Sequence, residues 1–265
     1  MTTLYQGDCL ELMKNIPDKS IDMILCDLPY GTTHCKWDAV IPFEPLWEQY
    51  NRIVKDNGAI LLFSSQPFTT DLICSNRKMF RYEIIWKKTQ KTGFYNAKKM
   101  PLRAHENICV FYKNLPSYNP QMNHLNPKEI VSFGRTRKNS DYKKTSGNAF
   151  GCVSKEKAES WSYTDNGTRY PTDIIEFSNW NGALFGNTEK HIPHPTAKPV
   201  PLLQYLIKTY TNEGETVLDN CMGSGSTGVA CVNAGRDFIG IELDENYFKT
   251  AENRINQSIK DKEEK

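Results

Sequence analysis

The fold is decided by the stretch Thr216-Val217-Leu218-Asp219-Asn220-Cys221-Met222-Gly223-Ser224-Gly225-Ser226-Thr227-Gly228. A short apolar strand, 216–218, leads into a loop of pattern Gly-x-Gly-x-x-Gly, and a helix to about residue 234 follows. A second strand, 238–241, ends at Glu242, roughly 20 residues beyond the first glycine. This order of strand, loop, helix and acid is typical of a loop that binds a nucleoside cofactor, although a plain tight turn would use the same glycines.

Two features of this segment favour an adenosyl cofactor that carries positive charge over a nicotinamide dinucleotide. Asp219 ends the strand, where its carboxylate would repel a pyrophosphate but could hold the ammonium of a methionine moiety, directly or through water. Residues 243–265 are too few to supply the remaining strands of a dinucleotide-binding sheet. We therefore expect the N-terminal half to complete the sheet, with the cofactor loop last in the chain.

The rest of the chain alternates between strand and helix patterns. Expected strands are 2–6, 21–26, 59–63, 82–87 and 107–113, and expected helices are 10–16, 43–55 and one that carries Leu202, Leu203, Leu206 and Ile207 on one side. The fold class is thus α/β, a Rossmann-like, doubly wound and mostly parallel sheet. Residues 114–193 are polar with little periodicity, which predicts an inserted region between a first half, 1–113, and a second half, 194–265.

The segment Asp27-Leu28-Pro29-Tyr30 follows the buried strand 21–26, so it should share one crevice with Asp219 beyond the carboxyl ends of the strands. An exocyclic amine is a poor nucleophile and needs acceptors for both of its N–H bonds. The Asp27 carboxylate can accept one, and Pro29 favours an extended Leu28 whose carbonyl can accept the other. Tyr30 offers an aromatic face to an extruded base. An ordinary strand end with a Pro-Tyr-Gly turn is the alternative.

The net charge is +2, but the charged residues are unevenly distributed along the chain. Residues 81–144 contain 14 Lys or Arg and four acids, a balance of +10, which leaves −8 for the remainder. Aromatic residues interleave with these cations, as expected where phosphates are neutralised and bases stack, although a solvated Lys-rich face is the simpler reading. Candidate nucleic-acid contacts are Lys87, Lys88, Lys98, Lys99, Arg103, Arg135, Arg137 and Lys138.

Composition excludes several other classes. With 38% apolar residues the chain can form a substantial core, yet no apolar run approaches the ~20 residues of a membrane span and no signal peptide is evident. A cytoplasmic location is the default expectation. The eight cysteines form no C-x-x-C pair and the histidines are scattered, so we expect reduced thiols and no metal site.

Five elements in order resemble the permuted, beta-class DNA amino-methyltransferases. They are Gly7-Asp8-Cys9, Asp27 to Tyr30, His194 to Pro199, Asp219 to Gly228, and Glu242. The resemblance covers most of the chain and implies a circularly permuted methyltransferase fold with 114–193 as the target-recognition region. Leu28 departs from the commoner proline, but that position is thought to act through its carbonyl, so activity should survive.

By this resemblance S-adenosylmethionine is the methyl donor, and S-adenosylhomocysteine is the second product. Asp8 and Cys9 would lie near its adenine, Glu242 would hold the ribose, and Thr196 and Lys198 would approach the methionine carboxylate. The alternatives are that Lys198 is a helix-start cation and that Cys9 is a packing residue. His194 is expected to be structural. The implied cofactor-binding residues are Asp8, Cys9, Asp27, Thr196, Lys198, Asp219, Met222, Gly223, Ser224, Gly225 and Glu242.

The implied catalytic segment is Asp27, Leu28, Pro29 and Tyr30, and the substrate is a flipped base in double-stranded DNA. An acid at the first position resembles adenine-N6 enzymes, whereas serine is typical of cytosine-N4 enzymes, so adenine is preferred. Rival hypotheses are a cytosine-N4 methyltransferase, a catalytically silent DNA-binding subunit and an NAD-dependent oxidoreductase. A homodimer and a cognate restriction endonuclease are further partners that the family allows. Gly31 to Asp38, Lys87 to Arg103 and 114–193 are the candidate base-reading segments.

Overall fold

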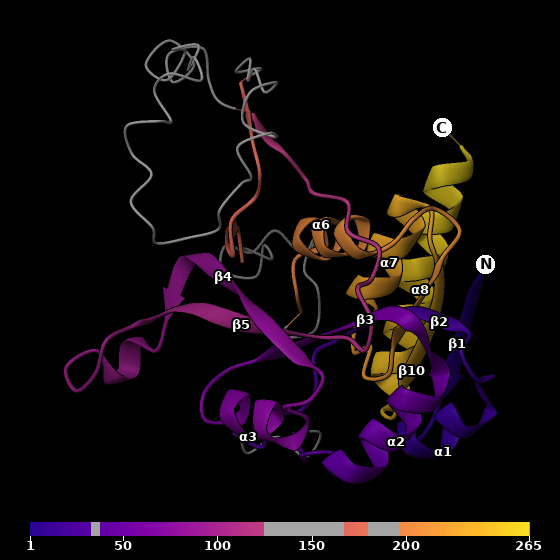
Figure 1. Cartoon of the computed structure of the whole chain (residues 1–265), viewed down its shortest axis with the longest axis horizontal. Coiled ribbons are helices and arrows are strands. Elements are labelled where there is room, and N and C mark those ends of the chain that lie inside the picture. The colour runs from indigo at the N-terminus through magenta and orange to yellow at the C-terminus, as the bar shows by residue number, and fades with distance from the viewer. Residues whose placement is uncertain (33–37, 125–166, 180–196, 265) are drawn as a thin grey trace, which may run out of the picture. The chain divides into compact units, whose positions relative to one another are not determined.

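The computed structural model describes residues 1–32, 38–124, 167–179 and 197–264. Within them, eight strands form one sheet in the order β1-β10-β9-β2-β3-β5-β4-β8 (Figure 1). Their bounds are β1 (Thr2–Gln6), β2 (Ile21–Cys26), β3 (Val54–Ser64), β4 (Phe80–Thr92), β5 (Arg103–Phe111), β8 (Ile174–Phe177), β9 (Thr216–Asp219) and β10 (Asp237–Glu242). Of these eight, β5 alone runs against the others. The predicted mostly parallel α/β sheet is confirmed.

The two ends of the chain interleave in this sheet, as the position of the cofactor loop predicted. β1 pairs with β10, so that Gln6 lies opposite Glu242, and β9 pairs with β2 through Met23 opposite Val217 and Ile24 opposite Leu218. The backbone N–H of Gly7 also donates to the Glu242 carbonyl at 2.9 Å. The N-terminal and C-terminal segments therefore build one continuous sheet.

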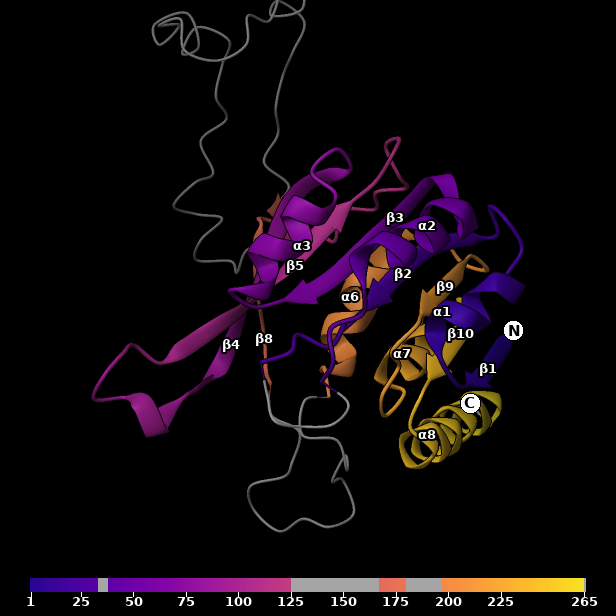
Figure 2. The same cartoon turned by 90° about the horizontal axis from the view of Figure 1, so that it is seen from below.

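Helices cover both faces of the sheet (Figures 1 and 2). One face packs against α1 (Cys9–Leu12), α2 (Phe43–Ile53) and α3 (Phe68–Ser75), and the other against α6 (Val200–Tyr210), α7 (Ser226–Ala234) and α8 (Glu245–Glu263). Short 3-10 turns, η1 (Met13–Asn15) and η2 (Phe94–Asn96), complete the helical elements of the described residues. This is the doubly wound arrangement expected from strands that are apolar throughout.

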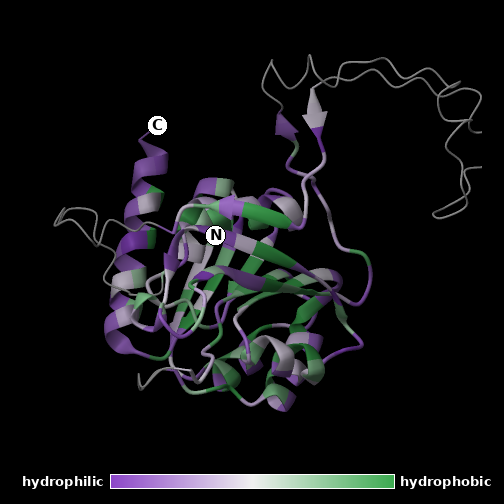
Figure 3. Cartoon of the chain, turned by 90° about the vertical axis from the view of Figure 1, so that its left-hand side faces the viewer, coloured by the Kyte–Doolittle hydropathy of each residue, from purple (hydrophilic) through white to green (hydrophobic). Residues whose placement is uncertain are grey.

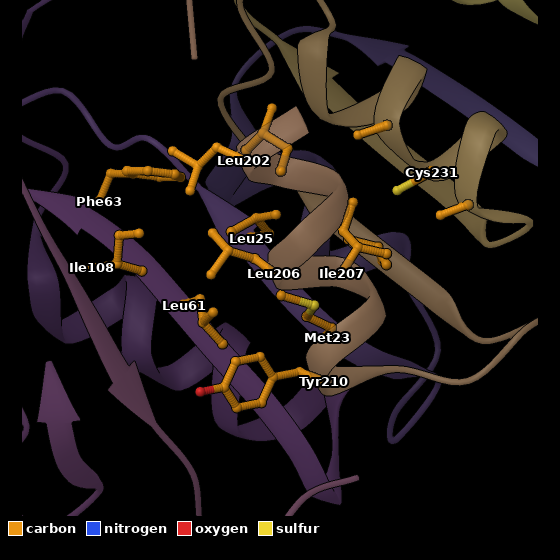
Figure 4. Packing of buried hydrophobic residues seen from close by; sticks show 14 of the residues in the cluster. Met23, Leu25, Leu61, Phe63, Ile108, Leu202, Leu206, Ile207, Tyr210 and Cys231 are labelled. Carbon is orange, nitrogen blue, oxygen red and sulfur yellow. The ribbon is translucent and has the colours of Figure 1, made fainter. Parts of the chain in front are cut away.

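Alternate residues of the central strands pack into two hydrophobic cores, one on each face of the sheet. Met23 and Leu25 of β2 face the α6 side, and Ile24 and Cys26 face the α2 side. Figure 4 shows Met23, Leu25 and Leu61 directed toward Leu206 and Ile207 of α6. Apolar residues concentrate in these central strands, whereas α8 carries a hydrophilic outer surface (Figure 3). No helix in the described residues is long and apolar enough to cross a membrane.

The structure differs from the expected elements in a few places. The expected helix 10–16 is divided into α1 and η1, and α3 was not expected. The strand β3 begins at Val54, five residues earlier than expected, because Val54 pairs with Ile21 before a register shift. β8 lies within the polar region 114–193 and had no periodic signal. It is ordered by pairing with β4, where Trp86 Nε1 donates to the Phe177 carbonyl at 3.0 Å.

Residues 120–171 form a separate compact unit. Its described part contains β6 (Asn123–His124) and β7 (Thr168–Arg169), which pair antiparallel. The other unit comprises 1–119 and 172–265. The predicted division of the chain into residues 1–113, 114–193 and 194–265 stays a prediction.

Candidate active site at the carboxyl edge of the sheet

Acidic residues stand at the carboxyl ends of four neighbouring parallel strands. Asp8 follows β1, Glu242 ends β10, Asp219 ends β9 and Asp27 follows β2. Because these strands are parallel and adjacent, all four carboxylates lie along one edge. The predicted catalytic segment, Asp27 to Tyr30, and the glycine-rich loop therefore lie at the same edge of the sheet, which the predicted crevice requires.

Asp219 is buried, with 3% of its surface exposed, and its carboxylate organises the loop. Its oxygens accept hydrogen bonds from the Thr227 hydroxyl at 2.6 Å and from the Cys221 backbone N–H at 3.1 Å. Burial raises the pKa of Asp219 to about 6, although these hydrogen bonds act in the opposite direction. Both carboxylate oxygens of Asp219 therefore hold the loop. The contact of Asp219 with an ammonium stays a prediction.

The glycines of the loop are required by geometry. Gly225 has a φ of +76°, and a Cβ there would lie 2.8 Å from the Cβ of Ala251 on α8. At Gly228 a Cβ would lie 2.4 Å from Ile255 and 2.8 Å from Phe238. The pattern therefore lets α7 approach both β10 and α8, and it presents the N-terminus of α7 at the acidic edge.

Glu242, at the end of β10, binds the glycine-rich loop through its carboxylate. Its carboxylate accepts the backbone N–H of Gly223 at 2.8 Å and that of Asp244 at 2.9 Å. Burial raises the pKa of Glu242 above its ordinary value, against the effect of these amides. Met222 and Ser224, also predicted to contact the cofactor, are both buried, and Ser224 accepts from Arg254 of α8.

Asp8 and Cys9 begin α1 beside this loop. The Asp8 carboxylate caps the helix through the N–H groups of Leu10, at 2.8 Å, and Glu11, at 3.3 Å. Interaction with the Cys221 thiol, and burial after it, raise the pKa of Cys9 far above its ordinary value. Cys9 is therefore a protonated thiol at neutral pH.

The segment Asp27 to Tyr30 is held in a fixed turn. The Tyr30 hydroxyl donates to Asp27 Oδ1 at 2.7 Å, and its ring stacks on Phe68 with 5.0 Å between the ring centroids. Burial, and after it the charge of Asp27, raise the pKa of Tyr30 well above its ordinary value, so the phenol keeps its proton and donates. The side chain of Leu28 is 4% exposed and packs in the α2-side core.

Sequence reasoning placed Asp38 only at the end of a candidate base-reading segment and missed that it shapes this turn. Its carboxylate accepts the backbone N–H groups of Tyr30 at 2.7 Å, Gly31 at 2.9 Å and Thr32 at 2.9 Å. Asp38 is 7% exposed, so these charge-assisted bonds are shielded from water. Its position just after the tetrapeptide was the one available signal.

Asp27 also belongs to a partly buried group of charges, here called the ion cluster: Asp27, Lys88, Glu106 and Lys198. Lys198, just before α6, forms an ion pair with Asp27 Oδ2, and Lys88 of β4 forms one with Glu106 Oε1 of β5. Lys198 Nζ lies 3.5 Å from Glu106 Oε2. Burial alone would lower the pKa of Lys198, but Asp27 and Glu106 outweigh it and raise that pKa. Sequence reasoning missed Glu106, which carries no local motif.

The predicted DNA-contacting cations fall into three groups. Lys87, whose side chain is 57% exposed, forms a surface ion pair with Glu176 of β8 at 2.7 Å, and Lys88 is 11% exposed within the ion cluster. A DNA contact of either lysine stays a prediction. Lys98, Lys99 and Arg103 are exposed on the hairpin that joins β4 to β5, which projects from the sheet in Figure 2. Thr196, His194, Arg135, Arg137 and Lys138 lie outside the described residues.

A model of the N6_N4_Mtase family, described as DNA methylase, matches residues 21–253. The chain belongs to this family. The resemblance inferred from the motifs is thereby confirmed, and the predicted catalytic segment, the ion cluster and the glycine-rich loop all fall within the matched range.

Curated relatives match over nearly the whole chain. The DNA adenine methyltransferase YhdJ of Escherichia coli is 28% identical over 96% of this chain and 82% of its own length. The Type II methyltransferase M1.MboII of Moraxella bovis is 27% identical over 96% of both chains.

Solved structures share the fold. The M1.HpyAVI complex with SAM has a TM-score of 0.62 at 23% identity and covers 97% of this chain and 100% of the other. The PvuII cytosine-N4-specific DNA methyltransferase has a TM-score of 0.64 at 16% identity over 98% and 90%. Among the described residues, no group of three or more His, Cys, Asp or Glu is arranged to hold a metal ion.

The raised pKa of Asp219 predicts a specific pH dependence of stability. Between pH 3.8, the ordinary pKa, and about 6, the unfolded chain has lost the proton that the folded chain keeps, so the free energy of unfolding falls as pH rises. The decrease from this group is of order 3 kcal/mol at most. Asp219→Asn should lack it, as measured by urea unfolding of the cofactor-free chain across this range.

Asp56→Asn provides a control of opposite sign. Hydrogen bonds from Lys19 and Lys113 lower the pKa of the exposed Asp56, so its contribution appears as pH rises and is lost as pH falls. Parallel stability curves for the wild type and Asp219→Asn would contradict the account of Asp219.

Proposed function

We propose that this chain transfers a methyl group from S-adenosylmethionine to N6 of an adenine that has been turned out of double-stranded DNA. The observation that carries the proposal is the juxtaposition of Asp27 to Tyr30, at the end of β2, with the glycine-rich loop at the end of β9. Adjacent parallel strands can bring a base amine and a methyl donor into one crevice.

The residues of the loop fit the proposed cofactor by charge. Asp8, Asp219, Glu242 and Asp27 form an acidic edge, which favours a cation and disfavours a pyrophosphate. Glu242 is well placed to accept ribose hydroxyls with lone pairs that the amides of Gly223 and Asp244 leave open. When bound, S-adenosylmethionine supplies the methyl group as an electrophile on its sulfonium.

The catalytic segment fits an exocyclic amine. Asp27 and the Leu28 carbonyl would accept its two N–H bonds and direct its lone pair at the methyl group. The burial of Leu28 in the core explains how a leucine serves at this position, because it anchors the backbone that carries the carbonyl. Tyr30, backed by Phe68, would stack on the base.

The choice of adenine rests on the acid at position 27 and on the name of the Escherichia coli relative, a DNA adenine methyltransferase. The alternative on the same scaffold, cytosine N4, is not favoured by the curated relatives. The names of the Type II relatives support a place in restriction–modification, with a cognate endonuclease as the expected companion. A homodimer stays a prediction.

The β4–β5 hairpin is the proposed DNA-contacting element of the described residues. Lys98, Lys99 and Arg103 are exposed on it, and Tyr95 at its tip is 99% exposed. Cations neutralise phosphates and an exposed aromatic ring can stack on bases, so this combination suits a nucleic-acid surface. The hairpin leaves the sheet at the same edge as Asp27, since β4 runs parallel to β3 and β2.

The activity is tested by incubating the chain with labelled S-adenosylmethionine and genomic DNA, followed by mass spectrometry of the nucleosides. The expected product is N6-methyladenine. Detection of N4-methylcytosine instead would show that cytosine, not adenine, is the target base. If the chain bound the cofactor but left no label in DNA, a catalytically silent DNA-binding subunit would be favoured.

Asp27→Ala should reduce methyl transfer by at least about a thousandfold, because the amine loses its charged acceptor. Calorimetry should show S-adenosylmethionine affinity little changed, and Lys198 keeps Glu106 as a counter-charge, so the variant should fold. Turnover within tenfold of the wild type would remove Asp27 from the proposed role.

Reversing the charges of Lys98 and Lys99 to Glu should weaken DNA binding and flatten its salt dependence. Removal of one phosphate contact reduces the slope of log K against log salt by about 1. Lys14→Glu together with Lys249→Glu is a matched control, because both lysines are exposed and each is paired with a glutamate three or four residues before it in the chain. If the hairpin variant kept the wild-type slope, these lysines would lie outside the DNA interface.

A further inference from the structure

Glu106 is the one acid of the ion cluster to which the proposed reaction gives no part. It lies on β5, at the edge where β4 and β5 face the catalytic segment, and its side chain is 17% exposed. Burying charges is costly unless each is paired, so a four-charge cluster next to a reacting centre calls for a physical reason.

The two carboxylates of the cluster are satisfied to different degrees. Asp27 has both oxygens engaged, Oδ1 by the Tyr30 hydroxyl and Oδ2 by Lys198. Glu106 Oε1 is paired with Lys88, whereas Oε2 has only the long ion pair of 3.5 Å with Lys198. Its Oε2 is buried and, among the described residues, has no hydrogen-bond partner. The cluster thus contains one open acceptor.

That open acceptor faces Lys198. The ammonium lies 3.5 Å from Glu106 Oε2, too far for a strong charge-assisted hydrogen bond, which forms at ~2.8 Å. It also lies 5.1 Å from the centroid of the Phe63 ring, whose face favours a cation. A movement of under ~1 Å would therefore bring Lys198 into contact with Glu106 without leaving it unpaired.

Such a movement would matter for the chemistry at Asp27. An ammonium on Oδ2 withdraws negative charge from the carboxylate and occupies a position that an incoming amine needs. Burial opposes ionisation of Glu106, but Lys198 and Lys88 outweigh it and lower its pKa, so Glu106 is an anion at neutral pH. It can accept Lys198 as a full counter-ion.

We propose that Glu106 is a positioning residue that takes Lys198 from Asp27 when the target amine arrives, which frees Asp27 Oδ2 to accept an N–H bond of the amine. This inference rests on the proposed methyl transfer. No covalent bond forms or breaks in the exchange, and the total charge of the cluster stays constant. The cost of freeing Asp27 is offset by the new contact at Glu106.

Glu106→Gln tests this exchange, because glutamine keeps the size and polarity of the side chain but cannot carry the charge that attracts Lys198. We expect kcat for methyl transfer to fall by tenfold or more, with the dissociation constants for S-adenosylmethionine and for DNA within twofold of the wild type. A merely structural role would instead lower the thermal midpoint and the cofactor affinity together.

Glu83→Gln is the matched control. Glu83 lies on β4 and accepts a hydrogen bond from Asn107 at 2.6 Å, so the same substitution removes a charge from the same pair of strands outside the ion cluster. Its kcat should equal that of the wild type. In a Lys198→Gln background, Glu106→Gln should change kcat by less than twofold, because Glu106 acts through Lys198.

The outcomes separate the two proposals. If the wild type methylates adenine and Glu106→Gln keeps its kcat within twofold, or if Glu106→Gln still costs tenfold without Lys198, the exchange is wrong and the proposed function stands. If the wild type neither binds S-adenosylmethionine nor methylates DNA, the proposed function fails, and the exchange fails with it.

Discussion

The parallel pairing of β2 with β9 is the constraint on which the site depends. Met23 opposite Val217 and Ile24 opposite Leu218 join segments that are almost 200 residues apart in the chain. The paired residues are fully buried, so backbone hydrogen bonds and apolar packing on two faces hold this register. A slip of one residue would exchange the core faces of β2 and move Asp27 away from the loop. The pairing therefore fixes the position of Asp27 relative to the loop.

The acidic edge is stable because each carboxylate is held by different partners. Asp8 caps a helix, Asp219 holds a hydroxyl and an amide, Glu242 holds two amides, and Asp27 pairs with Lys198. Backbone N–H groups and one lysine thus reduce the mutual repulsion of the four acids. The remaining negative field is suited to a cationic methyl donor, so the features that stabilise the edge also prepare it for that ligand.

In the turn Asp27 to Tyr30, the same residues serve the packing and the proposed chemistry. The Leu28 side chain belongs to the core while its carbonyl is the proposed second acceptor, Asp38 ties three consecutive N–H groups, and Phe68 supports the Tyr30 ring. This rigid support lowers the freedom that an extruded base would otherwise have to restrict. The ion cluster adds the one part of the turn's surroundings for which we propose a second arrangement.

The sequence by itself determined the fold class, the family, and the segments Asp27 to Tyr30 and Asp219 to Gly228, because strand periodicity, glycine spacing and strand-end acids are local signals. The tertiary structure alone decided that Lys198 meets Asp27 across 171 residues, that Glu106 completes the cluster, and that β8 joins the sheet. These features arise from contacts between distant segments, and a single lysine or glutamate carries no pattern that could reveal its partner.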